Sequence, residues 1–265
     1  MTYPQQPSEG SVLHWREGGI AQIRFNRPQA LNAIDTVMAA GFLKACQDIA
    51  ADSEVRAVWI SAQGRAFMAG GDLAAMLADP VPIANELIAG MHGGLRLLAE
   101  LDAPVVASVQ GAVAGGGLGL VLSCDMVLAA EGTQFGVAYP LIGASCDCST
   151  SWALPRLVGQ HKAMEMVILG DPIGAEEALS LGLCNRVYPL ADLEAQARKL
   201  VERIAQGPTV AYGHLRRLIR ASLHSNLDTH LDAEAHGFRA CAATADFKEG
   251  VSAFLNKRAA QFKGH

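Results

Sequence analysis

The order of the apolar patterns along the chain is the feature that most constrains its fold. Short apolar segments typical of strands alternate with helical patterns up to about Asp192, and only helical patterns follow. This strand–helix alternation repeats at least three times, which favours right-handed crossover connections between parallel strands. We therefore expect an α/β core over residues 1–195 and an all-helical region over residues 196–265.

Individual elements can be placed within this order. Two alternating segments in residues 12–25, separated by Gly18 and Gly19, predict a hairpin. Asp35 is a suitable N-cap for a helix over residues 35–50. Apolar runs and helical spacing predict the remaining core elements, which are strands at 55–61, 105–110 and 126–130 and a helix at about 83–100.

Composition narrows the classes of partner. Acidic residues outnumber basic ones, 26 to 21, which argues against a nucleic-acid surface. No uninterrupted apolar run is long enough for a membrane span, so we expect no membrane partner. The six cysteines show no CxxC pair, and no His, Cys and Asp cluster has the spacing of metal ligands. We expect a cytoplasmic protein with reduced thiols and no metal site.

Two glycine-rich segments follow predicted strands, at residues 65–73 and 111–119. Glycine lets backbone N–H groups approach a ligand closely, and the start of a following helix leaves such groups unpaired. The second segment is not a dinucleotide fingerprint, because Leu120 occupies the position of the last glycine. The alternative for either segment alone is that its glycines only allow tight strand–helix packing.

Five motifs together resemble the signatures of the crotonase (enoyl-CoA hydratase/isomerase) superfamily, and the similarity runs from about Val12 to Lys263. They lie at residues 26–33, 66–73, 111–117, 182–187 and 249–258. The resemblance implies a spiral of ββα turns and a C-terminal helical trimerisation region, in a homotrimer or a dimer of trimers. It also implies an acyl-CoA substrate and no permanently bound cofactor, since coenzyme A arrives as part of the thioester.

The resemblance further assigns roles to single positions. The N–H groups of Gly71 and Gly116 fall where the family forms its oxyanion hole. A thioester carbonyl gains negative charge when its α-carbon loses a proton, and each prearranged donor stabilises that charge by about 3–4 kcal/mol. The coenzyme A contacts implied by the same motifs are Arg27, Ala30, Arg65, Ala69, Phe254 and Lys257.

The acid/base positions set this chain apart from the hydratases of the family. Those enzymes use two glutamates, one to activate water and one to deliver a proton. The corresponding positions here are Gly119 and Tyr139, neither of which has a carboxylate. We therefore expect poor hydratase activity.

Asp147 is the acidic residue that remains in the active-site segment. Its neighbours include Cys146, Cys148 and Trp152, which would partly remove its carboxylate from water. The alternative is that Asp147 caps the helix that follows Ser149.

An aspartate at this position occurs in two branches of the superfamily. In dienoyl-CoA isomerases and ring-opened phenylacetyl-CoA isomerases it shuttles a proton, whereas in 4-chlorobenzoyl-CoA dehalogenases it attacks the aromatic ring. The dehalogenases also have an aromatic residue at the place of Tyr139 and a catalytic histidine where His92 stands, twelve residues before Pro104. A histidine on a helix is otherwise usually an exposed group or one whose hydrogen bonds are satisfied within the fold.

The leading hypothesis is an enoyl-CoA isomerase in which Asp147 is the proton shuttle. The alternatives are a dehalogenase-like or other hydrolytic enzyme that uses Asp147 and His92, and a pseudoenzyme that only binds acyl-CoA.

Overall fold

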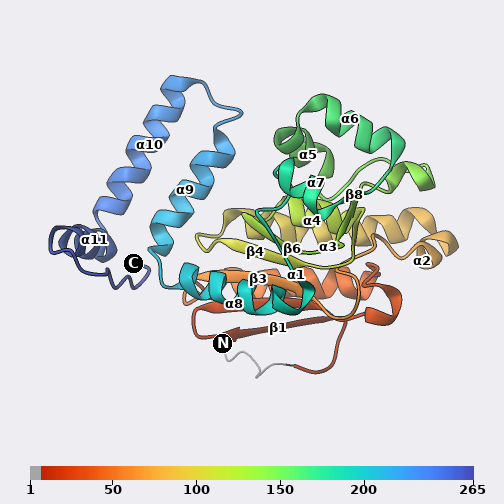
Figure 1. Ribbon diagram of the computed structural model, residues 1–265, viewed down its shortest axis with the longest axis horizontal. Helices are drawn as coiled ribbons and strands as arrows, with labels where there is room; N and C mark the ends of the chain where they lie inside the picture. Colours follow the sequence, from red (N-terminus) through yellow and green to blue (C-terminus); the bar gives the residue numbers. More distant parts are fainter. Residues whose placement is uncertain (1–6) are drawn as a thin grey trace.

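The computed structural model describes residues 7–265 and has a mixed sheet at its centre (Figure 1). Six strands follow the order β1-β2-β3-β4-β6-β9. The first two form the predicted hairpin, and every later neighbour pairs in parallel. The strands are β1 (Val12–Glu17), β2 (Ile20–Phe25), β3 (Ala57–Ala62), β4 (Val105–Val109), β6 (Met126–Ala130) and β9 (Arg186–Tyr188).

Helices cover both faces of this sheet because its strands alternate their side chains between two apolar clusters. On β3, Val58 and Ile60 belong to the cluster that packs against α1 (Thr36–Ala50) and α3 (Pro80–Glu100). Trp59 belongs to the cluster on the other face, which is covered by α8 (Leu190–Ala205). As predicted, the Asp35 side chain caps α1 by accepting the Met38 N–H.

The C-terminal region is all-helical, as expected. The predicted boundary between residues 195 and 196 lies within α8, whose buried side chains pack on the sheet. The helices beyond the sheet are α9 (Thr209–Ala221), α10 (Leu227–Ala242) and α11 (Ala245–Leu255), and Figure 1 shows them at one end of the molecule. In the part of the chain that is described, no helix is long and apolar enough to cross a membrane.

A second, three-stranded sheet has the order β5-β7-β8 and lies beside the glycine-rich segments. Its strands are β5 (Ala112–Ala114), β7 (Gln134–Gly136) and β8 (Ile173–Gly174), with α4 (Gly116–Leu122) directly after β5. The other helical elements are η1 (Pro28–Ala30), α2 (Leu73–Ala78), η2 (Tyr139–Ile142), α5 (Thr150–Val158), α6 (Gln160–Leu169) and α7 (Ala175–Ser180).

Candidate active site

The two glycine-rich segments lie against each other. A Cβ atom on Gly115 would lie 3.3 Å from the Cα atom of Gly70, so a side chain there would press on the other loop. Gly70 and Gly115 also have φ angles of 102° and 53°, which favour glycine. Both segments therefore need glycine for backbone shape as well as for close approach.

Two N–H groups of these loops remain available to a ligand. The neighbouring donors are used, since the Asp72 N–H donates to the Ile34 carbonyl at 2.9 Å and the Gly115 N–H to the Gly136 carbonyl at 3.1 Å. Within residues 7–265, neither the Gly71 nor the Gly116 N–H donates to a protein acceptor. This arrangement suits the oxyanion hole predicted from the sequence.

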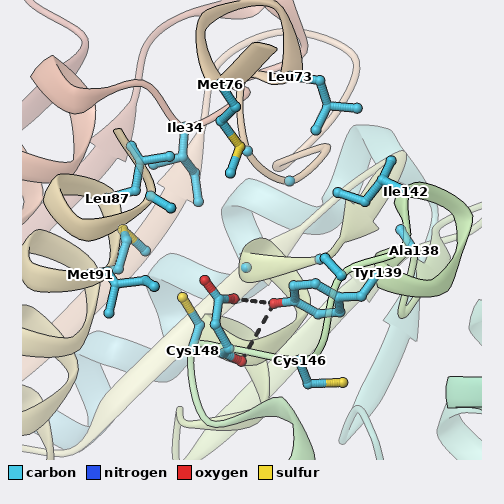
Figure 2. Close-up of a pocket in the computed structure, with 18 of the residues that line it drawn as sticks. Ile34, Leu73, Met76, Leu87, Met91, Ala138, Tyr139, Ile142, Cys146 and Cys148 are labelled. Atoms are coloured by element: carbon cyan, nitrogen blue, oxygen red, sulfur yellow. Dashed lines mark hydrogen bonds between the residues drawn. The ribbon is translucent and has the colours of Figure 1, made fainter. Parts of the chain in front are cut away.

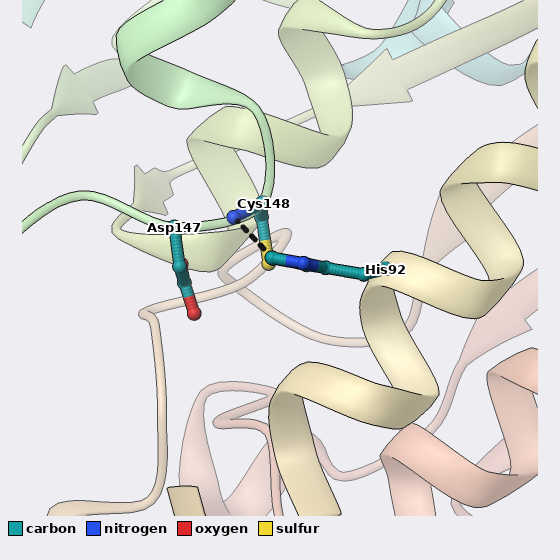
Figure 3. A group of neighbouring side chains, drawn as sticks. All are labelled: His92, Asp147 and Cys148. Atoms are coloured by element: carbon teal, nitrogen blue, oxygen red, sulfur yellow. Dashed lines mark hydrogen bonds between the residues drawn. The ribbon is translucent and has the colours of Figure 1, made fainter. Parts of the chain in front are cut away.

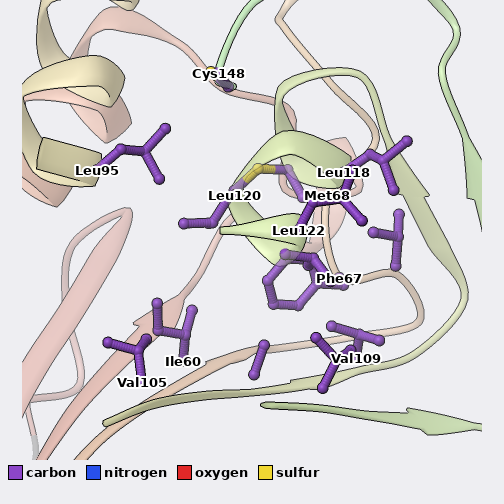
Figure 4. Packing of buried hydrophobic residues seen from close by; sticks show 14 of the residues in the cluster. Ile60, Phe67, Met68, Leu95, Val105, Val109, Leu118, Leu120, Leu122 and Cys148 are labelled. Atoms are coloured by element: carbon purple, nitrogen blue, oxygen red, sulfur yellow. The ribbon is translucent and has the colours of Figure 1, made fainter. Parts of the chain in front are cut away.

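A dense apolar layer supports the loops from beneath. Phe67 and Met68 of the first segment pack with Leu118 and Leu120 of α4 (Figure 4). A Cβ atom on Gly117 would lie only 2.7 Å from the Cβ atom of Met68, so the first turn of α4 touches the first loop. Side chains at this density leave little freedom to either donor.

A pocket of about 590 Å³ opens over the two donors. Its wall is mostly apolar, and Figure 2 shows the side chains of Ile34, Met76, Leu87, Met91 and Ile142 around it. Asp147 is the one carboxylate among the lining residues, and no lysine or arginine lines the pocket.

Asp147 is half-buried in the loop between η2 and α5. The Tyr139 hydroxyl donates a hydrogen bond to its Oδ1 atom (Figure 2). A Cβ atom on Gly116 would lie 3.8 Å from that oxygen, so the carboxylate faces the glycine loops. Asp147 is not the cap of α5, because Ser149 holds that position and Asp147 contributes only its carbonyl, to the Thr150 N–H.

The loop that carries Asp147 has a special backbone shape. Cys148 and Ser149 have φ angles of 47° and 67°, a conformation that costs about 1 kcal/mol or more for residues with a side chain. Gly119 makes room for it, since a Cβ atom there would lie 2.2 Å from the Cys148 carbonyl oxygen. The absence of a side chain at residue 119 is thus a packing requirement of this site.

His92 holds the same loop from the opposite side. It extends from α3, and its Nε2 atom accepts the Cys148 N–H at 3.0 Å. The lone pair of this nitrogen is thus engaged by the backbone of the loop. His92 lines the pocket and is only partly exposed, and the hydrogen bond from Cys148 fits the alternative of a histidine satisfied within the fold.

The electrostatics of the site keep its other acidic groups protonated. Burial, and then the nearby Asp147 carboxylate, raises the pKa of the Tyr139 phenol well above its usual value. Burial and the same carboxylate raise the pKa of the Cys148 thiol. Tyr139 is therefore a hydrogen-bond donor to Asp147 across the physiological pH range.

Four of the predicted coenzyme A contacts lie on the loops near the pocket. Ala69 lines it, and Arg65 is exposed at the start of the same segment with no ion pair to the residues described. Arg27 is instead paired with Asp35 and Asp72, at 3.2 and 3.1 Å. Ala30 ends η1, next to these pairs.

The other two predicted contacts are not brought to this pocket within one chain. Phe254 is 84% exposed on α11, and Lys257 follows the end of that helix. Neither residue lines the pocket. Figure 1 shows α11 at the end of the molecule away from α2, which borders the pocket.

Sequence reasoning missed most of the apolar wall. Met76 of α2 and Leu87 and Met91 of α3 line the pocket. The helical spacing of Leu87 and Met91 predicted one buried face, but periodicity does not reveal whether a face meets the core or a cavity.

Known proteins resemble this chain over nearly its whole length. Residues 16–265 match a family model described as enoyl-CoA hydratase/isomerase. The chain is 35% identical to 1,2-epoxyphenylacetyl-CoA isomerase of Escherichia coli strain K12, over 96% of this chain and 98% of that protein. It is 30% identical to 4-chlorobenzoyl coenzyme A dehalogenase-2 of Arthrobacter sp., over 90% of this chain and 88% of that protein.

A solved structure of a related enzyme also resembles this chain over nearly its whole length. The crystal structure of an enoyl-CoA hydratase from Mycobacterium smegmatis superposes with a TM-score of 0.89 at 32% identity, over 96% of this chain and 99% of that one. Isomerase, dehalogenase and hydratase are thus all named among the relatives, and the reaction has to be argued from the site.

Proposed function

Because this chain belongs to the enoyl-CoA hydratase/isomerase family of the crotonase superfamily, we propose that it is an enoyl-CoA isomerase. The family assignment confirms the predicted crotonase fold with its helical C-terminal region. The observation that carries the proposal is that Asp147 is the one carboxylate among the pocket-lining residues, beside the free Gly116 N–H.

A single carboxylate is enough for a double-bond shift. Asp147 removes a proton from the α-carbon of a 3-enoyl-CoA or ring-derived CoA thioester. The thioester becomes a dienolate, and negative charge develops on its carbonyl oxygen. The Gly71 and Gly116 N–H groups stabilise that oxygen by about 3–4 kcal/mol each. The same carboxyl then delivers a proton to the γ-carbon, on the same face of the substrate, and it delivers deuterium once it has exchanged with deuterated water.

Hydration fits this site less well. It needs one group to deprotonate water and another to protonate the α-carbon. Gly119 has no space for a side chain, and Tyr139 is a protonated phenol that already donates to Asp147. Both observations support the isomerase over a hydratase.

The dehalogenase-like alternative requires His92 to activate water. The Nε2 lone pair of His92 is occupied by the Cys148 N–H. This geometry favours a role for His92 in supporting the Asp147 loop. Without a histidine to activate water, Asp147 is better suited to act as a base than as a nucleophile. A pseudoenzyme would not need a carboxylate at this pocket position.

One experiment separates these reactions. The protein is given 3-enoyl-CoA in deuterated water, and separately 4-halobenzoyl-CoA, and both products and protein are analysed by mass spectrometry. An isomerase incorporates deuterium at the α- or γ-carbon and carries no adduct. An aryl ester on Asp147 after a single turnover would instead identify a nucleophile.

We also propose that the enzyme is a homotrimer or a dimer of trimers. The C-terminal helices expose large apolar side chains, including Ile219, Phe238 and Phe254, which a partner subunit would cover. In such an assembly Phe254 and Lys257 could reach the coenzyme A of a neighbouring subunit. Light scattering of the protein, alone and after Ile219→Glu, tests this assembly.

A further inference from the structure

Three side chains with different ligand atoms meet at the inner wall of the pocket. His92 extends from α3, and Asp147 and Cys148 are neighbours on the facing loop (Figure 3). One nitrogen of His92, one carboxylate oxygen of Asp147 and the Cys148 sulfur all lie within 4.8 Å of one another. Their sequence spacing does not reveal the group, because His92 is 56 residues away from Cys148.

These three atoms are a donor set that suits Zn²⁺ and related divalent cations. Zinc binds imidazole nitrogen, carboxylate oxygen and thiolate sulfur at about 2.0–2.3 Å in a tetrahedron. Two donors on one tetrahedral ion are then roughly 3.5 Å apart. Because the three atoms lie within 4.8 Å of one another, a closure of no more than about 1.3 Å brings them to that geometry. All three residues line the pocket, so a cation can enter and its fourth position can face the open space.

We propose that the pocket binds a thiophilic divalent cation through His92, Asp147 and Cys148, and that this cation inhibits the enzyme. The inhibition, but not the binding, rests on the proposed role of Asp147 as the catalytic base. A carboxylate that coordinates a cation cannot accept the α-proton. A cation at this wall also occupies the space that the thioester needs beside Gly116.

Cation binding replaces one hydrogen bond and one sulfur–hydrogen bond at the site. The Cys148 N–H gives up its hydrogen bond to His92 Nε2, and that lone pair turns to the cation. The Cys148 sulfur–hydrogen bond breaks as the sulfur–metal bond forms, and the proton goes to solvent. Tyr139 can keep its hydrogen bond to Oδ1 of Asp147 while Oδ2 coordinates.

Cobalt(II) is the probe, because thiolate ligation gives it a charge-transfer band in the near ultraviolet. The purified, metal-free protein is titrated with Co²⁺ in the absence of substrate. We expect one equivalent to produce the band together with the visible absorption of a tetrahedral ion. Cys148→Ser should remove the band, and Asp147→Asn should weaken Co²⁺ binding at least tenfold.

Cys146→Ser is the matched control, because the Cys146 thiol points in the opposite direction from Cys148 in Figure 2. This variant should keep the band and change the affinity for Co²⁺ less than twofold. Absence of the band in the wild type, or its persistence in Cys148→Ser, overturns the proposal. If Cys148→Ser does not fold, unchanged Co²⁺ affinity in Asp147→Asn overturns it instead.

The inhibition is measured separately with Zn²⁺ and 3-enoyl-CoA. We expect Zn²⁺ to inhibit the wild type competitively, with reversal by a chelator and an at least tenfold weaker effect in Cys148→Ser. Full activity in enzyme that shows bound cobalt overturns the inhibitory role. A cobalt band in a protein that isomerises no 3-enoyl-CoA would reject the proposed function and leave the metal site standing.

Discussion

The Tyr139 hydroxyl donates a hydrogen bond to Oδ1 of Asp147, the one carboxylate among the residues that line the pocket. The sequence motifs predict that Tyr139 stands where a hydratase of this family has its second glutamate. The tyrosine therefore orients the base that the proposed isomerisation uses.

Removing this hydrogen bond should slow the reaction without preventing binding. A hydrogen bond to a charged group contributes about 1.5–3 kcal/mol. We expect Tyr139→Phe to lower kcat at least tenfold with little change in KM, measured by steady-state kinetics. Tyr188→Phe is the control, because its hydroxyl lies on the surface near Arg186 and should leave kcat unchanged. An equal loss in both variants would contradict the positioning role.

Asp147→Asn tests the base itself. The amide has the same shape and still accepts from Tyr139, but it cannot take the α-proton. Isomerisation should fall by about 10²–10⁴-fold, the usual contribution of a general base. Calorimetry with a non-reactive acyl-CoA should give a Kd within about threefold of the wild type, because both oxyanion donors remain. Retained turnover would reject Asp147 as the base.

Gly116→Pro tests the oxyanion hole. Proline is tolerated in the first turn of a helix, where Gly116 lies, but it removes the N–H. Loss of one such donor should reduce kcat by about 10²–10³-fold. Gly116→Ala is the matched control, since it keeps the donor while adding a Cβ atom close to Ile34 and Cys148. The assignment requires proline to be clearly more damaging than alanine.

Gly119 should not accept a glutamate, the residue that the sequence motifs predict for a hydratase at this position. A Cβ atom added at residue 119 would overlap the Cys148 carbonyl. Gly119→Ala should therefore already cost roughly 1–3 kcal/mol of stability, measured by urea unfolding. Gly119→Glu should lose isomerase activity by displacing the Asp147 loop.

The wild type should hydrate crotonyl-CoA slowly, and a kcat of about 10 per second or more would contradict this account.

The C-terminal segment should show a defined acid dependence. Hydrogen bonds from Arg258, and then from the Gln261 N–H, lower the pKa of Glu249 to about 2. A carboxylate whose pKa is lowered on folding stabilises the protein above its unfolded value, and this contribution is lost as the pH falls. Glu249→Gln should therefore lower the thermal midpoint at pH 7, and its difference from the wild type should shrink between about pH 4.5 and pH 2. A difference independent of pH would contradict the linkage.

Local pattern was enough to predict several features of this protein. The glycines at 71, 116 and 119 and the acid at 147 are properties of single positions, and the motifs around them placed the chain in its family. The alternation of strands and helices likewise predicted the α/β core. These features depend on short-range periodicity and backbone preference, which a sequence carries directly.

The tertiary structure decided what those positions contact. It placed α8 on the sheet. The sequence could not predict this, because an amphipathic helix has the same pattern whether it covers a core or extends from it. It brought the His92 ring to the Cys148 N–H and the Tyr139 hydroxyl to Asp147, and it left Phe254 and Lys257 outside the pocket. Each of these relationships joins residues from separate elements. The packing of the crossover helices on the sheet determines them, and no local pattern in the sequence encodes that packing.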